Sequence, residues 1–500
     1  MFDSNTNATM PHMRKNVLLM LVPLLLISCQ GQPNSSSLTS TNDGGSYVIK
    51  EDTSIDFLCM ADKNYYPSLQ RIIRDFASAE PKVHVNLINP QGTGSYAMIE
   101  KNVVAGFFKE DYPDIVQCYP DNVVKYLAQG YAVNLDPYLN NPVYGLTEAD
   151  RSDYIASFLT EGTGYAEEGT YSLPFCKSTE LLYYNADVLI GLDLSGIDAS
   201  INGGQELDEA YLNSLTWEEL FQKLCPAIAT YNDGLDANKK IYDTSADHGI
   251  FTYDSDENCF ITLAKQYGYG YTRVDESGKG VIEFDNPGMK SVVTSLAEAK
   301  ANHYFHTRHS FGDYVSSLFT GRRALFTVSS TASLSYNYNQ KDPFNIGVAK
   351  LPMPAKEGQA YHSINQGPSI CILDHEDENR KTAAFLFWKF LTNEKNSNDW
   401  ALETGYLGIR NSSYTSNEYQ KAIAITEEST PYEKYVARNL KTSHEVRESF
   451  FNTAVFRGSS NARTNVGLLL GDCLKSTDLA SEIDDLFANY EENAKSFLAK

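Results

Sequence analysis

A strand, helix and strand pattern opens the chain over residues 55–87. The apolar run at 55–60 predicts a strand, and alternation at Val83, Val85 and Leu87 predicts a second one. Between them, four apolar residues fall on one face of a helix: Leu69, Ile72, Ile73 and Phe76. Two strands joined by a helix are expected to lie parallel, with a right-handed crossover. The chain is therefore expected to form an α/β fold.

Further elements are expected along the chain. Helices are predicted at 96–108 and 123–129, around an apolar pair at 115–116. Strands are predicted at 171–175 and 181–185, on either side of a polar turn. Thr216 is a candidate N-cap for a helix that carries Trp217 in the core, with Glu219 at the capping-box position. Helices dominate after Pro287, interrupted by strands at 324–328, 346–349 and 369–373; the last helix carries Ile483, Leu486, Phe487, Tyr490, Ala494 and Phe497.

A short apolar segment, Met13 to Cys29, precedes this α/β pattern. Arg14 and Lys15 give it a positive start, and its apolar core is shorter than the roughly 20 residues that span a bilayer. Residues 1–28 are thus predicted to be a signal peptide, with Met13 as an alternative start, rather than a core helix. The end of the segment, Leu-Ile-Ser-Cys, has the form of a bacterial lipobox, which predicts that Cys29 is lipidated. Residues 29–50 are polar and predict a flexible tether.

Composition narrows the class of protein. About 450 residues after the leader favour two lobes. A formal charge of −23 argues against a nucleic-acid partner. Beyond Cys29 there are seven scattered cysteines without a CxxC pair, so we expect core thiols and neither a disulfide framework nor a zinc site.

Common catalytic motifs are missing. His444-Glu445 has no histidine four residues further on, as zinc proteases require, and the chain has no GxSxG or Walker A sequence. Gly268 and Gly270 lack the third glycine of a dinucleotide site. The acidic loop at 231–247 does not fit the EF-hand spacing. We therefore expect no enzyme activity, no cofactor and no metal.

Several stretches in one order carry a family resemblance, covering nearly all of the chain after about residue 52. They are FASAEPKVHVNL (76–87), DIVQCY (114–119), YSLPFCKSTELLYYNADVL (171–189), LTWEEL (215–220), TVSSTASL (327–334), INQGPSICIL (364–373) and WALETGYLGIR (400–410). The chain resembles the extracellular solute-binding proteins of family 1, the receptors of carbohydrate ABC importers, and most of all their glycerol-3-phosphate-binding branch. The resemblance implies a type II periplasmic-binding-protein-like fold: two doubly wound α/β lobes joined by crossing hinge segments, with the ligand cleft between them. Residues 51–168 and 325–372 are expected in the N-terminal lobe, and residues 169–324 and 373–500 in the C-terminal lobe.

The resemblance also implies ligand contacts. The family's acidic contact falls on Pro120 here, so Asp121 is the expected substitute. The late arginine matches Arg463, with Arg457 as the alternative. Tyr253 or the YGYGY run at 267–271 is a candidate replacement for the paired tryptophans of the phosphodiester-binding branch. The full expected set is Tyr96, Asp121, Ser178, Ser330, Gly367, Tyr406 and Arg463.

Each of these residues also has a purely structural interpretation. The tyrosines are candidate packing residues, and the two serines are candidate helix N-caps. The function implied is that of a monomeric receptor, held at the outer face of the cell membrane by its lipid, which delivers a sugar, oligosaccharide or glycerol-3-phosphate-like polyol to permease subunits. The alternatives are a surface glycoside hydrolase, which requires two facing carboxylates, and an adhesin without a closing cleft.

Overall fold

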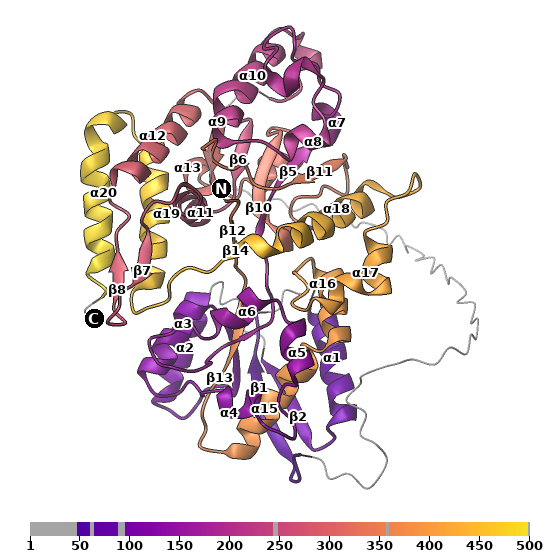
Figure 1. Cartoon of the computed structure of the whole chain (residues 1–500), viewed down its shortest axis with the longest axis vertical. Coiled ribbons are helices and arrows are strands. Elements are labelled where there is room, and N and C mark those ends of the chain that lie inside the picture. Colours follow the sequence, from indigo (N-terminus) through magenta and orange to yellow (C-terminus); the bar gives the residue numbers. More distant parts are fainter. Residues whose placement is uncertain (1–47, 61–64, 89–95, 244–248, 357–359, 499–500) are drawn as a thin grey trace, which may run out of the picture. The chain divides into compact units, whose positions relative to one another are not determined.

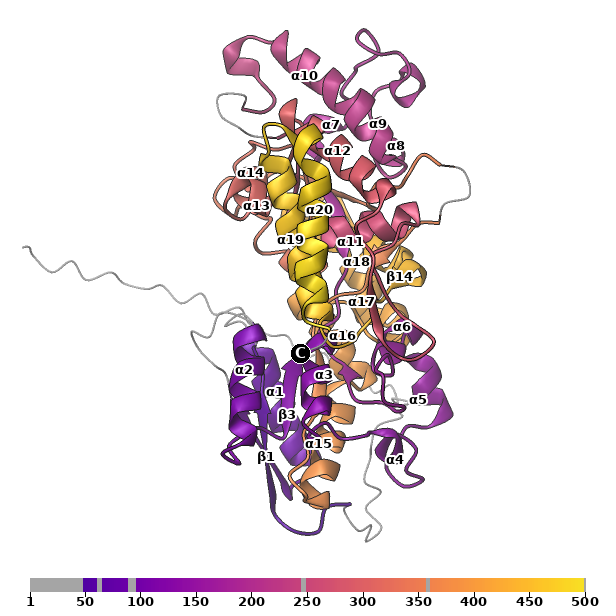
Figure 2. The ribbon, with the colours of Figure 1, turned by 90° about the vertical axis from the view of Figure 1, so that its left-hand side faces the viewer.

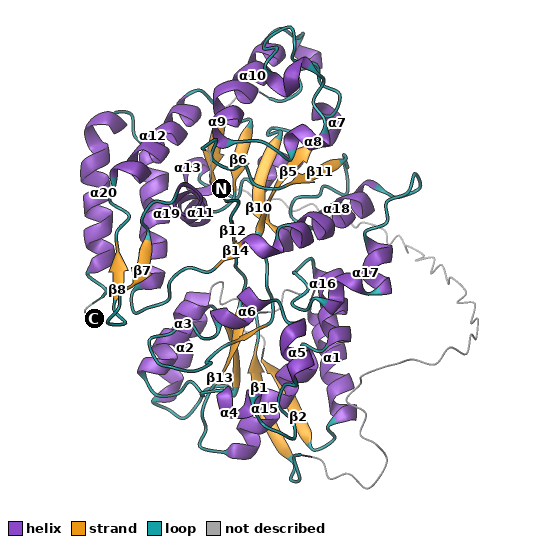
Figure 3. Ribbon diagram, viewed as in Figure 1, coloured by secondary structure: helices purple, strands orange, loops and turns teal. Residues whose placement is uncertain are grey.

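Two five-stranded sheets form the framework of the protein in the computed structural model (Figures 1 and 3). The structure describes residues 48–60, 65–88, 96–243, 249–356 and 360–498. They belong to one compact unit, Ser46–Lys500. The predicted signal peptide, Cys29 and most of the predicted tether lie outside the described residues.

The first sheet has the strand order β2-β1-β3-β13-β4. Its strands are β1 (Thr53–Leu58), β2 (Val83–Ile88), β3 (Ile115–Cys118), β4 (Leu173–Pro174) and β13 (Ser369–Ile372). Strand β1 is parallel to β2 and β3, which confirms the predicted strand–helix–strand unit. Strand β13 runs antiparallel to β3 and β4.

Helices cover this sheet to form the N-terminal lobe. They are α1 (Tyr66–Ala79), α2 (Tyr96–Phe107), α3 (Pro120–Ala128), α4 (Asp136–Leu139), α5 (Glu148–Asp153), α6 (Ala156–Glu161), α15 (Glu378–Leu391) and α16 (Glu394–Thr404). Leu69, Ile72 and Phe76 of α1 are buried, as their spacing predicts. Phe76 and Phe57 both meet Phe387 of α15 edge to face, so α1 and α15 are fixed on β1 by aromatic packing.

The second sheet has the order β11-β5-β10-β6-β9. Its strands are β5 (Glu180–Asn185), β6 (Phe251–Tyr253), β9 (Phe305–Thr307), β10 (Phe326–Ser330) and β11 (Ile346–Ala349). Strand β10 is antiparallel to β5 and parallel to β6, and β6 is parallel to β9. The carboxyl ends of β6, β9 and β10 therefore lie along one edge of the sheet.

The C-terminal lobe surrounds this second sheet, and Figure 2 shows α19 and α20 side by side at its outer face. Two short strand pairs complete the described strands: β7 (Thr272–Val274) with β8 (Gly280–Ile282), and β12 (Ser363–Ile364) with β14 (Phe450–Phe451). The helices are α7 (Ala186–Leu189), α8 (Glu209–Leu212), α9 (Trp217–Glu219), α10 (Cys225–Asp233), α11 (Asp256–Tyr267), α12 (Pro287–Ala301), α13 (Arg308–Phe311), α14 (Ser316–Thr320), α17 (Asn417–Ala422), α18 (Pro431–Glu445), α19 (Ser459–Lys475) and α20 (Leu479–Lys495).

Two neighbouring segments that pair with each other cross between the lobes. Residues 175–179 lead from β4 to β5, and residues 365–368 lead from β12 to β13. They pair antiparallel at Ser178 and Gln366, whose backbone N–H groups donate to each other's carbonyl oxygens at 2.9 and 3.0 Å. The polar turn expected between two strands at 176–180 is therefore the first crossing segment, and the flanking strands belong to different sheets.

The predicted lobe limits differ from the sheet assignments. Strands β10 and β11, expected in the N-terminal lobe within 325–372, lie in the second sheet, and only β13 of that range lies in the first. Helix α15, expected in the C-terminal lobe, packs on β1. The reason is that strand membership depends on long-range register, here β10 with β5, which the local apolar pattern does not contain.

The predictions of a helix cap at Thr216 and of a buried Trp217 are confirmed. Thr216 caps α9 by accepting a hydrogen bond from the Glu219 N–H at 3.0 Å, and Trp217 is buried. The seven cysteines after Cys29 are all buried. Within the described ranges, no helix combines the length and apolarity needed to cross a bilayer.

Candidate functional site

A polar cluster lies where α3 of the N-terminal lobe meets α11 and α19 of the C-terminal lobe. We define it by five residues: Asp121, Glu180, Asn258, Ser459 and Arg463. Asp121 lies in the first turn of α3 and accepts a hydrogen bond from the Ser459 hydroxyl at the start of α19. The cluster therefore joins the two lobes through side chains.

Arg463 is held within this cluster by Asn258. Its Nη2 donates to Asn258 Oδ1, and Asn258 Nδ2 donates to Glu180 Oε1 at 2.6 Å. The second Glu180 oxygen, Oε2, accepts from the Tyr253 hydroxyl at 2.6 Å. Four side chains from β6, β5, α11 and α19 thus form one continuous hydrogen-bonded chain.

The charge of Arg463 acts on four surrounding groups. Burial raises the pKa of Tyr119, Asp121, Glu180 and Tyr271, and the positive charge of Arg463 lowers each of these pKa values. For Glu180, burial dominates and raises the pKa to about 7, although Tyr253 and Asn258 donate to the ionised form. Arg463 is therefore close to acidic groups from both lobes.

Half-buried tyrosines lie beside the polar cluster. Tyr96, at the start of α2, meets Tyr119 edge to face with ring centroids 4.8 Å apart. Tyr406 follows α16 and lies against Tyr65 at 5.8 Å and Trp400 at 6.3 Å. Burial raises the pKa of Tyr96, and the neighbouring phenols of Tyr406 and Tyr119 raise it further. These rings can offer both an apolar face and a hydroxyl group, a combination that suits sugar-like ligands.

The remaining predicted residues lie at structural positions. Ser178 is buried in the first crossing segment, and Gly367 lies in the second with a φ of +89°. Ser330 ends β10 and caps the following turn, since its hydroxyl accepts from the Ala332 N–H at 3.2 Å. The N-cap interpretation therefore holds for Ser330, whereas Ser178 lies in an extended segment. For these three residues, ligand contact stays a prediction.

Sequence reasoning missed Glu180 and Asn258 as cluster members. Glu180 lies in the KSTE stretch, at the end of the predicted polar turn. Nothing in the local pattern around Asn258, inside α11, indicates a site. Tyr253 and Tyr271, named only as candidate tryptophan replacements, both lie next to the cluster, and Tyr253 is a fully buried donor to Glu180.

A cavity of about 490 Å³ is lined by both lobes, although none of the five cluster residues and none of the seven predicted residues lines it. Val124 and Leu127 of α3 lie on one side, and Val455 to Arg457 on another. Arg457 is exposed at this cavity, whereas Arg463 belongs to the cluster. Which of the two arginines contacts a ligand stays a prediction.

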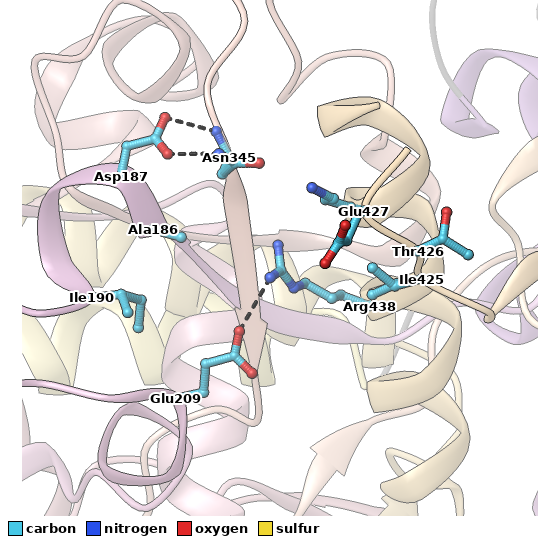
Figure 4. Close-up of a pocket in the computed structure, with 10 residues that line it drawn as sticks. Ala186, Asp187, Ile190, Glu209, Asn345, Ile425, Thr426, Glu427 and Arg438 are labelled. Atoms are coloured by element: carbon cyan, nitrogen blue, oxygen red, sulfur yellow. Dashed lines mark hydrogen bonds and ion pairs between the residues drawn. The ribbon is translucent and has the colours of Figure 1, made fainter. Parts of the chain in front are cut away.

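A larger cavity, of about 650 Å³, lies within the C-terminal lobe (Figure 4). Four of its polar side chains form two hydrogen-bonded pairs: Asp187 accepts from Asn345 at 2.7 Å, and Arg438 donates to Glu209 at 3.1 Å. None of the seven predicted residues lines it. Size alone therefore does not identify the site. Among the described residues, no group of three His, Cys, Asp or Glu side chains is placed to hold a metal ion.

The solved structures that show the same fold include the following three. UgpB from Mycobacterium tuberculosis, in complex with glycerophosphocholine, is 17% identical with a TM-score of 0.67 over 89% of this chain and 98% of that one. The sugar-binding protein MalE from Xanthomonas citri is 14% identical, with a TM-score of 0.65 over 89% and 98%. The GacH receptor of Streptomyces glaucescens, solved with acarbose, is 18% identical, with a TM-score of 0.62 over 89% and 98%. No curated protein sequence matches the chain.

The likeness to these structures confirms the type II periplasmic-binding-protein-like fold that the sequence predicted. The family model for bacterial extracellular solute-binding proteins matches residues 71–427, which include β2, β5, β10 and both crossing segments. This match covers more than half of the chain and places its folded part outside the cytoplasm. The protein therefore belongs to the family of bacterial extracellular solute-binding proteins.

Proposed function

We propose that this protein is the receptor of an ABC importer, capturing a carbohydrate or polyol derivative and delivering it to the membrane permease. The observation that carries the proposal is the polar cluster, because side chains of both lobes meet there beside half-buried tyrosines. Hydroxyl-rich ligands need many partners, since each unpaired polar group in a closed site costs about 1–3 kcal/mol.

Ligand capture in this proposal involves no bond chemistry. Binding between the lobes favours the state in which α3 and α19 are in contact, and the permease recognises that state. Family membership and the three structural neighbours support this role. We further propose that Cys29 carries the lipid that holds the monomer at the membrane.

The proposal is tested by a thermal-shift screen of the purified full-length protein against monosaccharides, oligosaccharides, glycerol phosphates and glycerophosphocholine. A ligand that binds only the folded state adds roughly 4 kcal/mol of stability at a thousandfold excess over its Kd. We expect one compound class to raise the Tm and to be recovered unchanged. Product formation would indicate a glycoside hydrolase instead, and a flat response in a folded sample would contradict the receptor role.

The matched variants are Tyr406→Phe and Tyr406→Ala. The first keeps the ring and removes the hydroxyl; the second removes both. If Tyr406 contacts the ligand, the Tm increase falls in both variants and is lost in the alanine variant. An equal Tm increase in the wild-type protein and in both variants would show that Tyr406 does not contact the ligand and only packs against Tyr65 and Trp400.

A further inference from the structure

The side chains around Arg463 carry more negative than positive charge. Glu180 is joined to Arg463 through Asn258, and Asp121 lies within reach of the Arg463 charge. Glu257, from α11, acts on Tyr119, Glu180 and Tyr271, the same groups on which Arg463 acts. One guanidinium and three carboxyl groups, those of Asp121, Glu180 and Glu257, therefore lie in this region.

Glu180 determines how Asn258 is oriented. Asn258 donates one amide hydrogen to Glu180 Oε1 at 2.6 Å and the other to Gln366 Oε1 at 2.7 Å. With both hydrogens used, the amide oxygen must face Arg463. Glu180 itself is only 2% exposed, and its second oxygen is held by Tyr253. A buried carboxyl group thus sets the position of the cation.

The N–H donors of Arg463 that Asn258 does not use determine which ligand groups can bind beside Arg463, in what we call the Arg463 subsite. A guanidinium has five N–H donors, and Asn258 takes one of them. A sugar hydroxyl can accept from the remaining donors and can also donate to Asp121 or Glu257. An ionised phosphate or carboxylate group can only accept, and it would lie near the carboxyl groups of Asp121 and Glu257 and near that of Glu180, which carries its charge above its pKa of about 7.

We infer that Glu180 is a specificity-determining residue that makes the Arg463 subsite select uncharged, hydroxyl-rich ligands over ligands bearing a phosphate or carboxylate group. This inference rests on the proposed receptor function and chooses between the ligand classes which that proposal contains. It assigns Arg463 the role of a hydrogen-bond donor whose charge is already balanced inside the protein.

The first test compares neutral and anionic ligands on the full-length wild-type protein. Glucose is titrated against glucose 6-phosphate and glucuronate, and glycerol against glycerol 3-phosphate, with maltose, maltotriose and glycerophosphocholine alongside. We expect the ligand with the highest affinity to be neutral. Each anionic analogue should bind with an affinity at least about tenfold lower than that of its neutral partner. Preferential binding of a phosphate-bearing compound would overturn the inference and leave the receptor function standing. Failure of every compound to bind would overturn the receptor function and this inference with it.

The second test uses Glu180→Gln, which keeps the size of the side chain and removes its charge. We expect the affinity for the anionic analogue, relative to its neutral partner, to rise about tenfold. Glu298→Gln on the exposed face of α12 makes the same change in net charge away from the cluster, and it should leave the ratio unchanged. An unaltered ratio in a folded Glu180→Gln protein would overturn the inference.

A pH series on the wild-type protein tests the same point without a variant. Tyr253, Glu257 and Arg463 act on the pKa of Glu180, and Glu180 in turn raises the pKa values of Tyr253, Cys259, Tyr183 and Tyr361. The phenols and the thiol have raised pKa values and stay neutral near pH 7, and burial holds the pKa of Glu180 itself at about 7.

Glu180 therefore gains its charge between pH 6 and pH 8, while glucuronate stays ionised throughout this range. We expect the preference for glucose over glucuronate to increase as the pH rises from 6 to 8. A preference that does not change with pH would contradict the role of Glu180.

Discussion

Gly367 shows how single residues fix the crossing segments. Its φ is +89°, and a Cβ at this position would lie 2.0 Å from the Cys176 carbonyl oxygen in the other segment. Left-handed backbone alone costs a residue with a side chain roughly 1–2 kcal/mol. The steric overlap adds to that, because the neighbouring atom is backbone and cannot rotate away.

Gly367→Ala is therefore expected to lower the free energy of unfolding by more than about 2 kcal/mol. Gly268→Ala is the matched control, since Gly268 has a φ of +72° with open space around its Cβ position. Chemical denaturation of both variants gives the comparison. Equal losses at the two positions would show that the crossing segments are not closely packed at Gly367.

Some residues of the polar cluster could be predicted from the sequence and others could not. Arg463 and Asp121 were identified through a family resemblance, and the structure places both in one cluster. Glu180 was missed because a polar residue before an apolar strand looks like the end of a turn. Its partners, Tyr253 and Asn258, are 73 and 78 residues further along the chain. Only the folded arrangement brings them together.

Among the elements, the first crossing segment carries a buried ion pair. Lys177 is fully buried, and its Nζ binds the Glu161 carboxylate of α6 and the Gly367 carbonyl oxygen at 3.0 Å. Ser369 donates to the same carboxylate at 2.8 Å. Removing one partner of such a pair leaves an uncompensated buried charge, which costs about 3–5 kcal/mol.

Lys177→Met is accordingly expected to destabilise the protein by about 3–5 kcal/mol in chemical denaturation. Lys395→Met serves as the control, because Lys395 pairs with Asp399 on the exposed side of α16 and its side chain is 74% exposed. Exposed pairs at this helical spacing contribute only about 0.3–0.5 kcal/mol. A loss for Lys177→Met as small as that for Lys395→Met would contradict the structural role of the buried pair.

Helices and strands could be predicted where the sequence signal lay within the element itself. Apolar spacing predicted α1, β1 and β2, and a parallel β1–β2 pair followed from their connection. The assignment of β10 and β11 to a sheet was wrong, since it required knowing that β10 pairs with β5, with Phe326 opposite Tyr184, 142 residues earlier. Strand partners at such separations leave no periodic trace in the sequence.

For the whole molecule, the proposed lipid anchor makes a prediction about location. Cys29→Ser removes the thiol that would carry the lipid and leaves the compact unit from Ser46 onward unaltered. We expect this variant to leave the membrane fraction and to appear in the soluble extracytoplasmic fraction with its ligand affinity retained. Membrane association that is independent of Cys29 would contradict lipid anchoring at this residue.

Capture between two lobes requires that the ligand change the position of one lobe relative to the other. The hydrogen bond from Ser459 to Asp121 joins α19 to α3 directly, and Arg463 lies one turn further along α19. A ligand held by the cluster and by the tyrosines of the N-terminal lobe would favour the state in which these contacts form.

Small-angle X-ray scattering of the full-length protein, with and without the ligand found by thermal shift, tests this claim most directly. We predict that saturating ligand lowers the radius of gyration and that Ser459→Ala, which removes the hydroxyl donor to Asp121, needs more ligand to reach the same value. Identical scattering curves with and without saturating ligand would contradict capture by closure of the two lobes.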